Sequence, residues 1–547
     1  MATLVAGLVG VWVPAPAQSA EWIVLCPTPQ QVSAGVNSYD ACIADGYSDS
    51  GYKAKASTSW WSQSVGHNCT NYVAYRLVQN GLENKRPAQL TGNAYNWGLA
   101  FASQTNDAPA VGSVAWWGQA FSSTGHLAYV EKVVSANEII VSEDNWGGDF
   151  RWRRVTRSGG LWPNGFIHLK DVGPSVQPPA TYGSYRPVTP TRIVDTRSGL
   201  GASGPLAGGS DTSILVAGRG PVPRTAVGAV VANVTVVGAS KPGWLLAYPS
   251  GSSPAASSTV NFGTGDTLAN QAVVGVGQDG RIRLKLSQSA NVLVDVVGWY
   301  PSYGHLTTTT PTRLLDTRYG IGTTGGRLGS GGRVDLQVTG TSVVPASGVD
   351  SVLLNLTAAS PAGPGWLAAW PTGTAQPTAS SLNYSAGTAL SGLVVAKVGS
   401  NGRVSIATNT ATDVVADIVG WYPSGGDYRG LTPARLLDTR NGTGVASSGA
   451  VDPGSVVRLQ VTGRGGVPST GVKAVVLTLT VTAPQKNGFL TAYPSGTSRP
   501  TTSNINYLAG QTIANTAFVM PSSDGYVDIF AQQGTHIVAD VQGYLAQ

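Results

Sequence analysis

Three positions in the N-terminal part of the chain have the residue types that thiol catalysis needs. Cys69 opens an amphipathic helical pattern, His126 heads an apolar strand pattern, and the next strand pattern, 138–142, runs into the polar segment 143–146. A helix start is electropositive because its backbone N–H groups are unpaired, which lowers the pKa of a thiol toward the reactive thiolate. The sequence therefore predicts a nucleophile, a base and a polar residue that holds the base by its second nitrogen.

These segments resemble the CHAP domains, cysteine- and histidine-dependent amidohydrolases or peptidases that cleave peptidoglycan. The motifs that carry the resemblance stand in the family's order, and they are residues 68–74 (NCTNYVA), 125–128 (GHLA) and 143–146 (EDNW). The resemblance implies an α+β papain-like domain. It makes Cys69 the nucleophile and His126 the general base and later acid. Glu143 becomes the orienting carboxylate, assisted by Asn145.

The implied mechanism is attack of the Cys69 thiolate on an amide carbonyl, followed by hydrolysis of a thioester. The backbone N–H of Cys69 is the oxyanion donor most consistent with a helix start. Tryptophans are dense in this region, and we interpret most of them as core and some as the lining of a substrate groove: Trp60, Trp61, Trp97, Trp116, Trp117 and Trp146.

The other two cysteines, Cys26 and Cys42, both precede Cys69. In an exported chain they can close a disulfide loop worth about 3 kcal/mol, which leaves Cys69 as the free thiol. The other pairings of three cysteines stay open.

Metal ligation is the alternative for the remaining polar residues. His67 could join His126 and His168 as zinc ligands, but the spacing fits no zinc motif, so we interpret His67 as a loop residue. Asp144 and Asp149 offer carboxylates for calcium without the regular alternation of oxygen ligands. We expect no metal and no other cofactor.

Length and composition limit the class of protein. A chain of 547 residues predicts about three to five domains. Charged residues make up 11% and hydrophobic residues 42%, which excludes intrinsic disorder. The 71 Gly and 33 Pro favour turn-rich β structure over a mostly helical fold. Three cysteines in so long a chain exclude a disulfide scaffold.

The first 20 residues have the pattern of a secretory signal, with an apolar run from Leu4 to Val13 and small residues after it. Basic residues are absent before the run, so the start could lie inside a longer signal. No other apolar stretch approaches the roughly 18 residues of a membrane helix. We expect an exported protein without a membrane span, extracellular or associated with the cell wall.

The C-terminal part contains one unit three times. The motif RIVDTR at 192–197 recurs as RLLDTR at 313–318 and 435–440, and similar matches occur in the middle and at the end of each unit. Each unit has short Val-, Leu- and Thr-rich runs between Gly, Pro, Ser and Asn, as in an antiparallel sandwich. Whether the three β-domains are separate or pack around a pseudo-threefold axis stays open.

The predicted organisation is a multidomain chain, an α+β domain followed by three all-β sandwich-like modules. The predicted boundaries are 1–20 for the signal, 21–171 for the CHAP domain, 172–186 for a Pro-rich linker, and 187–303, 304–425 and 426–547 for the repeats.

The repeats are predicted to attach the protein to the cell wall. Residues 172–547 carry 23 Lys and Arg against 16 Asp and Glu, a basic excess that draws them to anionic wall polymers, and linked weak sites raise avidity. We interpret Asp195 and Arg197, with their equivalents, as structural ion pairs rather than a polysaccharide site. Trp244, Trp366 and Phe489 are interpreted as core.

The sequence thus indicates a secreted peptidoglycan hydrolase, an N-acetylmuramoyl-L-alanine amidase or an endopeptidase. The expected partners are peptidoglycan and anionic wall polymers or glycans, with no nucleic acid, and the expected state is a monomer. The alternative is a non-catalytic wall-binding or surface-assembly protein with an inactive CHAP-like domain. Remodelling of the wall and attack on competing bacteria use the same chemistry and are not separated.

Overall fold

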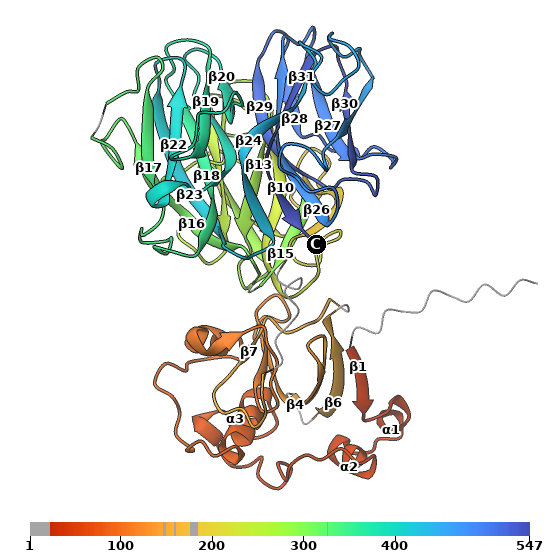
Figure 1. Cartoon of the computed structure of the whole chain (residues 1–547). Helices are drawn as coiled ribbons and strands as arrows, with labels where there is room; N and C mark the ends of the chain where they lie inside the picture. Colours follow the sequence, from red (N-terminus) through yellow and green to blue (C-terminus); the bar gives the residue numbers. More distant parts are fainter. Residues whose placement is uncertain (1–21, 146–148, 158–159, 176–183, 303, 325) are drawn as a thin grey trace, which may run out of the picture.

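The computed structural model describes residues 22–145, 149–157, 160–175, 184–302, 304–324 and 326–547. It contains a smaller N-terminal body and a larger all-β body, drawn below and above in Figure 1. The multidomain, mostly β character expected from the sequence is confirmed. The predicted signal segment and Trp146 lie outside the described residues, as does most of the predicted linker.

The N-terminal body is built on one seven-stranded sheet in the order β1-β6-β5-β4-β3-β7-β2. Its strands are β1 (Trp22–Cys26), β2 (Thr105–Asn106), β3 (Val114–Trp117), β4 (His126–Ser135), β5 (Glu138–Asn145), β6 (Asp149–Thr156) and β7 (Gly165–Ile167). The strand pattern predicted to end at Ser142 continues to Asn145, because the ladder between β5 and β6 pairs every residue of β5.

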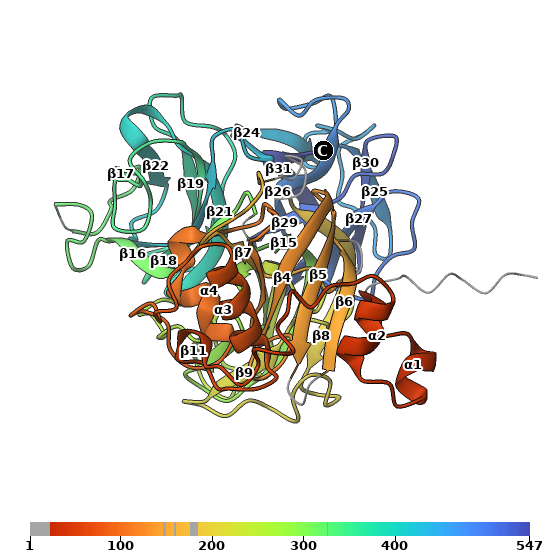
Figure 2. The ribbon, with the colours of Figure 1, turned by 90° about the horizontal axis from the view of Figure 1, so that it is seen from below.

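The helices of this body are α1 (Pro29–Ser33), α2 (Ser38–Ala44), α3 (Cys69–Gln79) and α4 (Tyr95–Ala100), with the 3₁₀ turns η1 (Trp60–Ser62) and η2 (Ala102–Gln104). Helix α3 packs on β4 and β5, and α4 on β3. Figure 2 shows both helices on one side of the sheet. Gly98 lets α4 approach the sheet, since a Cβ there would lie 2.4 Å from the ring of Trp116.

In the described part of the C-terminal body there are six four-stranded antiparallel sheets in three pairs, and we call each pair a module. Module 1 has β8 (Arg186–Asp195), β9 (Asp211–Leu215), β10 (Val227–Val237), β11 (Gly243–Pro249), β12 (Val260–Phe262), β13 (Thr267–Gly275), β14 (Arg281–Leu286) and β15 (Asn291–Pro301). Module 2 has β16 (Thr307–Asp316), β17 (Arg333–Gln337), β18 (Val349–Ala359), β19 (Gly365–Pro371), β20 (Leu382–Tyr384), β21 (Leu390–Lys397), the turn η5 (Ser400–Gly402), β22 (Arg403–Thr408) and β23 (Asp413–Pro423).

Module 3 has β24 (Tyr428–Asp438), β25 (Val456–Gln460), β26 (Val472–Thr482), β27 (Gly488–Pro494), β28 (Ile505–Tyr507), β29 (Ile513–Val519), β30 (Tyr526–Ala531) and β31 (His536–Ala546). The same connectivity recurs in all three modules: the inner sheet of module 1 runs β13-β10-β15-β8 and its outer sheet β12-β11-β14-β9. The domain boundaries drawn from the sequence stay predictions.

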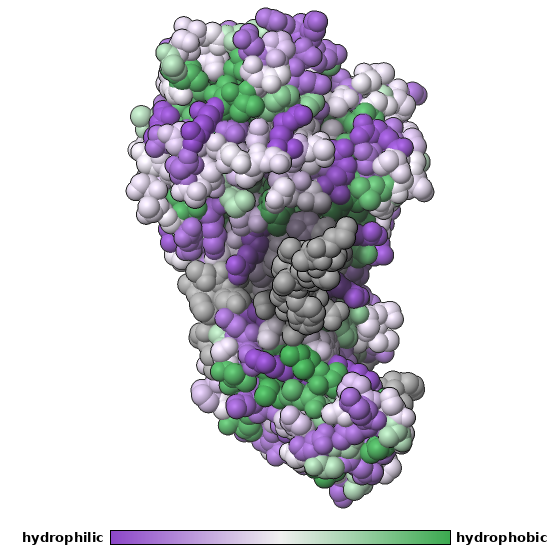
Figure 3. Space-filling view, turned by 90° about the vertical axis from the view of Figure 1, so that its right-hand side faces the viewer, coloured by the Kyte–Doolittle hydropathy of each residue, from purple (hydrophilic) through white to green (hydrophobic). Residues whose placement is uncertain are grey.

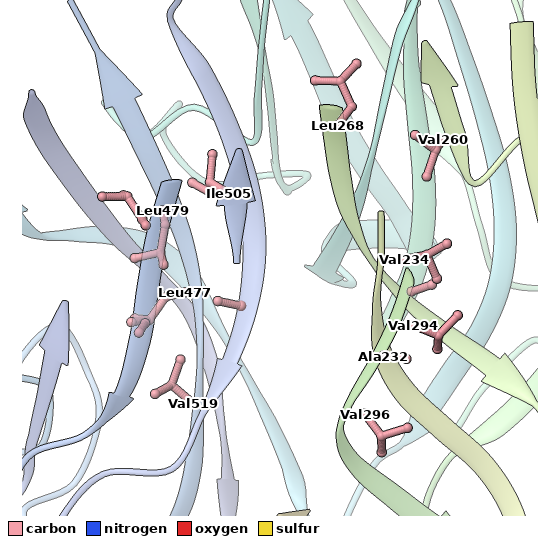
Figure 4. Packing of buried hydrophobic residues seen from close by; sticks show 14 of the residues in the cluster. Ala232, Val234, Val260, Leu268, Val294, Val296, Leu477, Leu479, Ile505 and Val519 are labelled. Atoms are coloured by element: carbon pink, nitrogen blue, oxygen red, sulfur yellow. The ribbon is translucent and has the colours of Figure 1, made fainter. Parts of the chain in front are cut away.

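Aliphatic side chains explain why these strands pair in two layers. Strand β10 is buried along nearly its whole length, and its β-branched residues pack against the outer sheet. Figure 4 shows two parts of one continuous core, with Val234 and Val294 of module 1 and Leu477 and Val519 of module 3.

The modules close into a ring around a pseudo-threefold axis. The edge strands β13, β21 and β29 of the three inner sheets contact one another. Each module also reaches its neighbour in cyclic order: Asn355 donates to the carbonyl of Ser258, Arg435 to that of Thr378 and Asn233 to that of Ser503. Of the two arrangements left open by the sequence, the structure has the packed one.

Module 1 also touches the N-terminal body. The backbone N–H of Ala120 donates to the carbonyl of Gln278 at 2.8 Å, and the hydroxyl of Thr225 donates to the carbonyl of Gly160 at 2.9 Å. On the face seen in Figure 3, hydrophilic and hydrophobic groups are interspersed over both bodies. No described helix is long and apolar enough to cross a membrane.

Candidate active site

Cys69 is the first residue of helix α3, as the sequence predicted. The side chain of Asn68 caps this helix by accepting from the backbone N–H of Asn71 at 2.8 Å. The backbone N–H of Cys69 has no acceptor within the helix, because the first four N–H groups of a helix have none. The thiol is free and partly exposed. This position supplies both a nucleophile and a nearby electropositive donor.

His126 is the base candidate, and Glu143 holds it. The Nε2 atom of His126 lies 2.7 Å from Oε2 of Glu143, and both side chains are buried. Burial alone would lower the pKa of His126, but the charge of Glu143, hydrogen bonds with Cys69 and Glu143, and the charge of Cys69 raise it to about 10. Because Glu143 occupies Nε2, the other ring nitrogen is the one that remains for the thiol.

Two further side chains hold Glu143. The Nε atom of Arg153 on β6 donates to Oε1, and the amide of Asn145 lies 3.4 Å from the same oxygen and 3.1 Å from the carbonyl of Asp149. Burial alone would raise the pKa of Glu143, but His126 and Arg153 lower it to about 2. The carboxylate therefore stays charged beside the imidazole.

Arg153 was missed by the sequence reasoning. The available signal was the basic run of residues 151–154 in the strand after Glu143, because neighbouring antiparallel strands bring opposite charges together. The guanidinium of Arg153 also lies 4.8 Å from the ring centroid of Trp22. Trp22 thus covers the ion pair from the edge strand β1.

A cleft of about 590 Å³ opens above the thiol. Its lining combines the start of α3 with the loop before β4, and includes Asn68, Cys69, Thr70, Gly92, Asn93, Phe121, Ser122, Thr124, His126 and Asn145. Phe121 is its aromatic wall, which the sequence did not single out. Most of the tryptophans are core, as the sequence indicated: Trp61, Trp97, Trp116 and Trp117 are buried.

The loop 118–125 forms one wall of the cleft and ends at Gly125, immediately before His126. Gly125 has φ +71°, and a Cβ there would lie 2.4 Å from the backbone nitrogen of Tyr95, so a larger residue would push the loop away from α4. From the other side, module 1 supports this loop at Ala120 through Gln278.

His67 belongs to a second polar group beside the site. Its Nδ1 atom lies 2.8 Å from the hydroxyl of Tyr39 and 3.1 Å from Oδ2 of the buried Asp144. Burial raises the pKa of Asp144 to about 6, although Tyr39 and His67 oppose the shift. His67 therefore joins the loop before Cys69 to strand β5. Among the described residues no group of three or more His, Cys, Asp or Glu is arranged to hold a metal ion.

The predicted disulfide between Cys26 and Cys42 is present, with 5.1 Å between the Cα atoms. It joins β1 to α2 and lies in the same buried cluster as Tyr39 and Phe150. Cys69 is left as the free cysteine of this chain.

Residues 58–145 match the model of the CHAP domain, a family of amidases and peptidases of the peptidoglycan-hydrolase type. The chain contains a CHAP domain. The matched span includes Cys69, His126, Glu143 and Asn145, whereas Arg153 lies just beyond it.

Comparison with curated proteins finds no match. Among solved structures, an atomic structure of Sulfolobus Turreted Icosahedral Virus covers 66% of this chain and 91% of its own, with 11% identity and a TM-score of 0.16. A triple jelly roll structure from an archaeal virus covers 67% of this chain and 91% of its own, with 11% identity and a TM-score of 0.16.

The Asp and Arg residues shared by the repeats form ion pairs with each other in all three modules. In module 1, Arg192 donates to Asp295 at 2.7 Å and to Asp195 at 3.3 Å, and Arg197 donates to Asp195 at 2.7 Å. The equivalent ion pairs are present in the other two modules. The structural interpretation of these residues agrees with this geometry.

The interpretation of Trp244, Trp366 and Phe489 as core does not agree with the structure. All three are only partly buried, at the second position of an outer-sheet strand. The reason is that alternate residues of an outer sheet face solvent, and these rings lie on that outer face rather than between the two sheets.

Proposed function

We propose that this protein is an exported peptidoglycan hydrolase, an amidase or endopeptidase with a Cys-His-Glu mechanism. The observation that carries the proposal is the Glu143–His126 hydrogen bond of 2.7 Å, with His126 lining the same cleft as Cys69, which lies at the start of a helix. A structural cysteine needs no buried, carboxylate-held imidazole beside it. A cleft of about 590 Å³ gives a substrate access to the thiol.

The first half-reaction forms a thioester. The thiolate of Cys69 attacks the carbonyl carbon of an amide, and the resulting oxyanion accepts from the backbone N–H of Cys69. His126 then gives its proton to the leaving nitrogen, and the C–N bond breaks. Glu143 stabilises the imidazolium and holds its orientation throughout.

The second half-reaction releases the acid. His126, now neutral, accepts a proton from a water molecule whose oxygen attacks the thioester carbon. The C–S bond breaks, the carboxylic acid product leaves, and the Cys69 thiolate and the imidazolium are restored. The protein's charges are thus the same before and after one turnover.

In this proposal the three modules hold the enzyme on the wall. Three linked copies would convert weak contacts with glycans or anionic wall polymers into avid attachment. The hydrogen bonds between module 1 and the CHAP domain would hold the catalytic cleft close to that surface.

The test is mass spectrometry of fragments released from purified peptidoglycan by the mature protein and by its Cys69→Ala variant. Release by the parent alone supports the hydrolase, and the new fragment ends identify the bond as glycan–peptide or within the peptide. If both proteins sediment with the wall and neither releases fragments, the non-catalytic wall-binding function takes its place.

A thiol assay separates these outcomes further. The parent should react with iodoacetamide at Cys69 at least tenfold faster than a free cysteine does at pH 6, because the imidazolium favours the thiolate. A rate equal to that of free cysteine would argue against catalysis even where wall binding is intact.

A further inference from the structure

A polar pocket lies at the boundary between modules 2 and 3. It has a volume of about 240 Å³, and module 2 contributes Trp366, Gln376 and Asn383 to its lining. From module 3 come Arg440 and Thr480, among others. It is far from the CHAP cleft in sequence and shares no lining residue with it.

A buried hydroxyl without a partner points to a ligand. Thr480 is 4% exposed, it lines this pocket, and within the described part of the chain its Oγ1 atom has no hydrogen-bond partner. Such a group has lost its hydrogen bonds to water, which is unfavourable unless another partner bonds to it. A hydroxylated ligand in the pocket would supply that bond.

The charges around the pocket cancel. Arg435 bonds Asp540 at 2.9 Å and Asp438 at 3.0 Å, and Arg440 bonds Asp438 at 2.7 Å. Two guanidinium groups therefore face two carboxylates, so the site offers N–H donors without a net field that would select an anion. This favours an uncharged ligand.

The remaining lining fits a sugar ring. Trp366 is partly buried and presents an aromatic surface against which the apolar face of a pyranose can pack. Asn383 and the threonines supply amide and hydroxyl groups, which can both donate and accept. The pocket is smaller than the roughly 300–1,000 Å³ of sites for drug-sized molecules, so it holds about one ring of a chain.

We propose that this pocket binds one neutral pyranose residue of a wall glycan. The inference rests on the proposed attachment function of the modules and names its site. The equivalent boundary between modules 3 and 1 lacks two of these groups. Module 1 has Val237 where module 3 has Thr482, and module 3 supplies Phe489 in place of Trp366.

The experiment uses the full chain with Cys69→Ala, so that binding is measured without hydrolysis. The probes are chitotetraose, followed by saturation-transfer NMR and calorimetry, and purified peptidoglycan stripped of anionic polymers, followed by sedimentation. We expect Trp366→Ala and Thr480→Val each to weaken binding at least fivefold, the change expected for one lost contact of about 1 kcal/mol.

Thr235→Val is the matched control. Thr235 occupies the same register in module 1, is 2% exposed and also has a hydroxyl without a partner among the described residues. Both Thr→Val changes should leave Tm unchanged or raise it, but only Thr480→Val should weaken binding. If Thr480 has no contact with the ligand, Thr480→Val should bind both probes as tightly as the parent.

Three outcomes would overturn the site: no binding of either probe by the parent, equal binding by the parent and the two pocket variants, or an equal loss in Thr235→Val. Each is independent of the hydrolase, because fragment release is measured separately on the protein that retains Cys69. Loss of hydrolysis with intact glycan binding would contradict only the catalytic proposal.

Discussion

The imidazole Nε2 of His126 lies 2.7 Å from the carboxylate Oε2 of Glu143, and both side chains are buried under the start of helix α3. In this position the carboxylate fixes the ring orientation and favours its charged form.

Glu143→Gln should lower kcat on peptidoglycan fragments by roughly 100-fold or more, since a neutral amide neither holds the imidazolium nor fixes its tautomer. Glu138→Gln is the matched control, because Glu138 lies on the same strand but pairs with Arg154 away from the cleft. Steady-state kinetics on both variants checks this. Equal activity of Glu143→Gln and the parent would remove Glu143 from the mechanism.

The pH dependence should follow His126. With its pKa raised to about 10, His126 keeps the proton needed by the leaving amine up to that pH, so kcat/KM should fall only as pH rises through about 10. The same shift stabilises the fold fully below the ordinary value of 6.5, and this contribution is lost between 6.5 and 10. A rate profile with an alkaline limb near 7 would contradict the assigned environment.

Glu143 gives the opposite sign for stability. Its pKa is lowered to about 2 from 4.5, so its contribution is present above 4.5 and is lost as pH falls through 2.

Arg153→Gln should lower kcat roughly 10- to 100-fold through a misplaced Glu143, with a smaller change in KM. Arg151→Gln is the matched control and should keep the activity of the parent, because Arg151 lies on the same strand but pairs with the partly exposed Asp149. Since Arg153 acts through Glu143, its variant should also move the alkaline limb of the rate profile away from that of the parent. A variant with reduced stability and an unmoved limb would assign Arg153 a structural role only.

The disulfide should stabilise the CHAP domain. Replacing Cys26 and Cys42 with Ser together should lower the free energy of unfolding by about 3 kcal/mol, because the bond closes a loop with a sequence separation of 16 residues. Denaturant unfolding of the full chain measures this change, and only the transition of the CHAP domain should move to a lower denaturant concentration. Simultaneous loss in the transition of the modules would show that the two bodies unfold together.

The contact between module 1 and the catalytic loop predicts a long-range effect. A Cβ at Gly280 would lie 2.7 Å from the Cβ of Ala217 in module 1 and 3.1 Å from the Cβ of Ala120 in the catalytic loop. Gly280→Val should therefore displace the loop before His126 and lower kcat/KM about tenfold. Gly402→Val makes the equivalent change in module 2, where the new side chain would meet Thr339 instead. Both should destabilise their modules, and only the first should lower activity.

Local patterns accounted for much of this structure before the fold was known. Asn68 is a good N-cap, so the helix start at Cys69 could be read from the sequence. The Val- and Thr-rich runs gave the strands, and the repeated motifs gave their order along the chain. The helix start and the strands depend on residues within about ten positions of each other, and the repeats are visible because the same short motif recurs.

Features that depend on distant segments could not be predicted. Arg153 reaches Glu143 only through the register of β5 and β6, and the closing of the ring depends on contacts more than 200 residues apart, such as Asn233 with Ser503. Trp366 was misjudged because its burial depends on which face of the outer sheet it occupies. Short sequence windows contain none of this information.

The ring of modules fixes how many copies the chain can carry. In an open array, a unit can be added or deleted near an end, because each unit contacts only its nearest neighbours. Here strand β28 of module 3 contacts β13 of module 1, so no end exists, and a fourth copy would have no place around the axis. A duplicated module should therefore be unable to join the ring. The number of modules should be constant among proteins that share this ring.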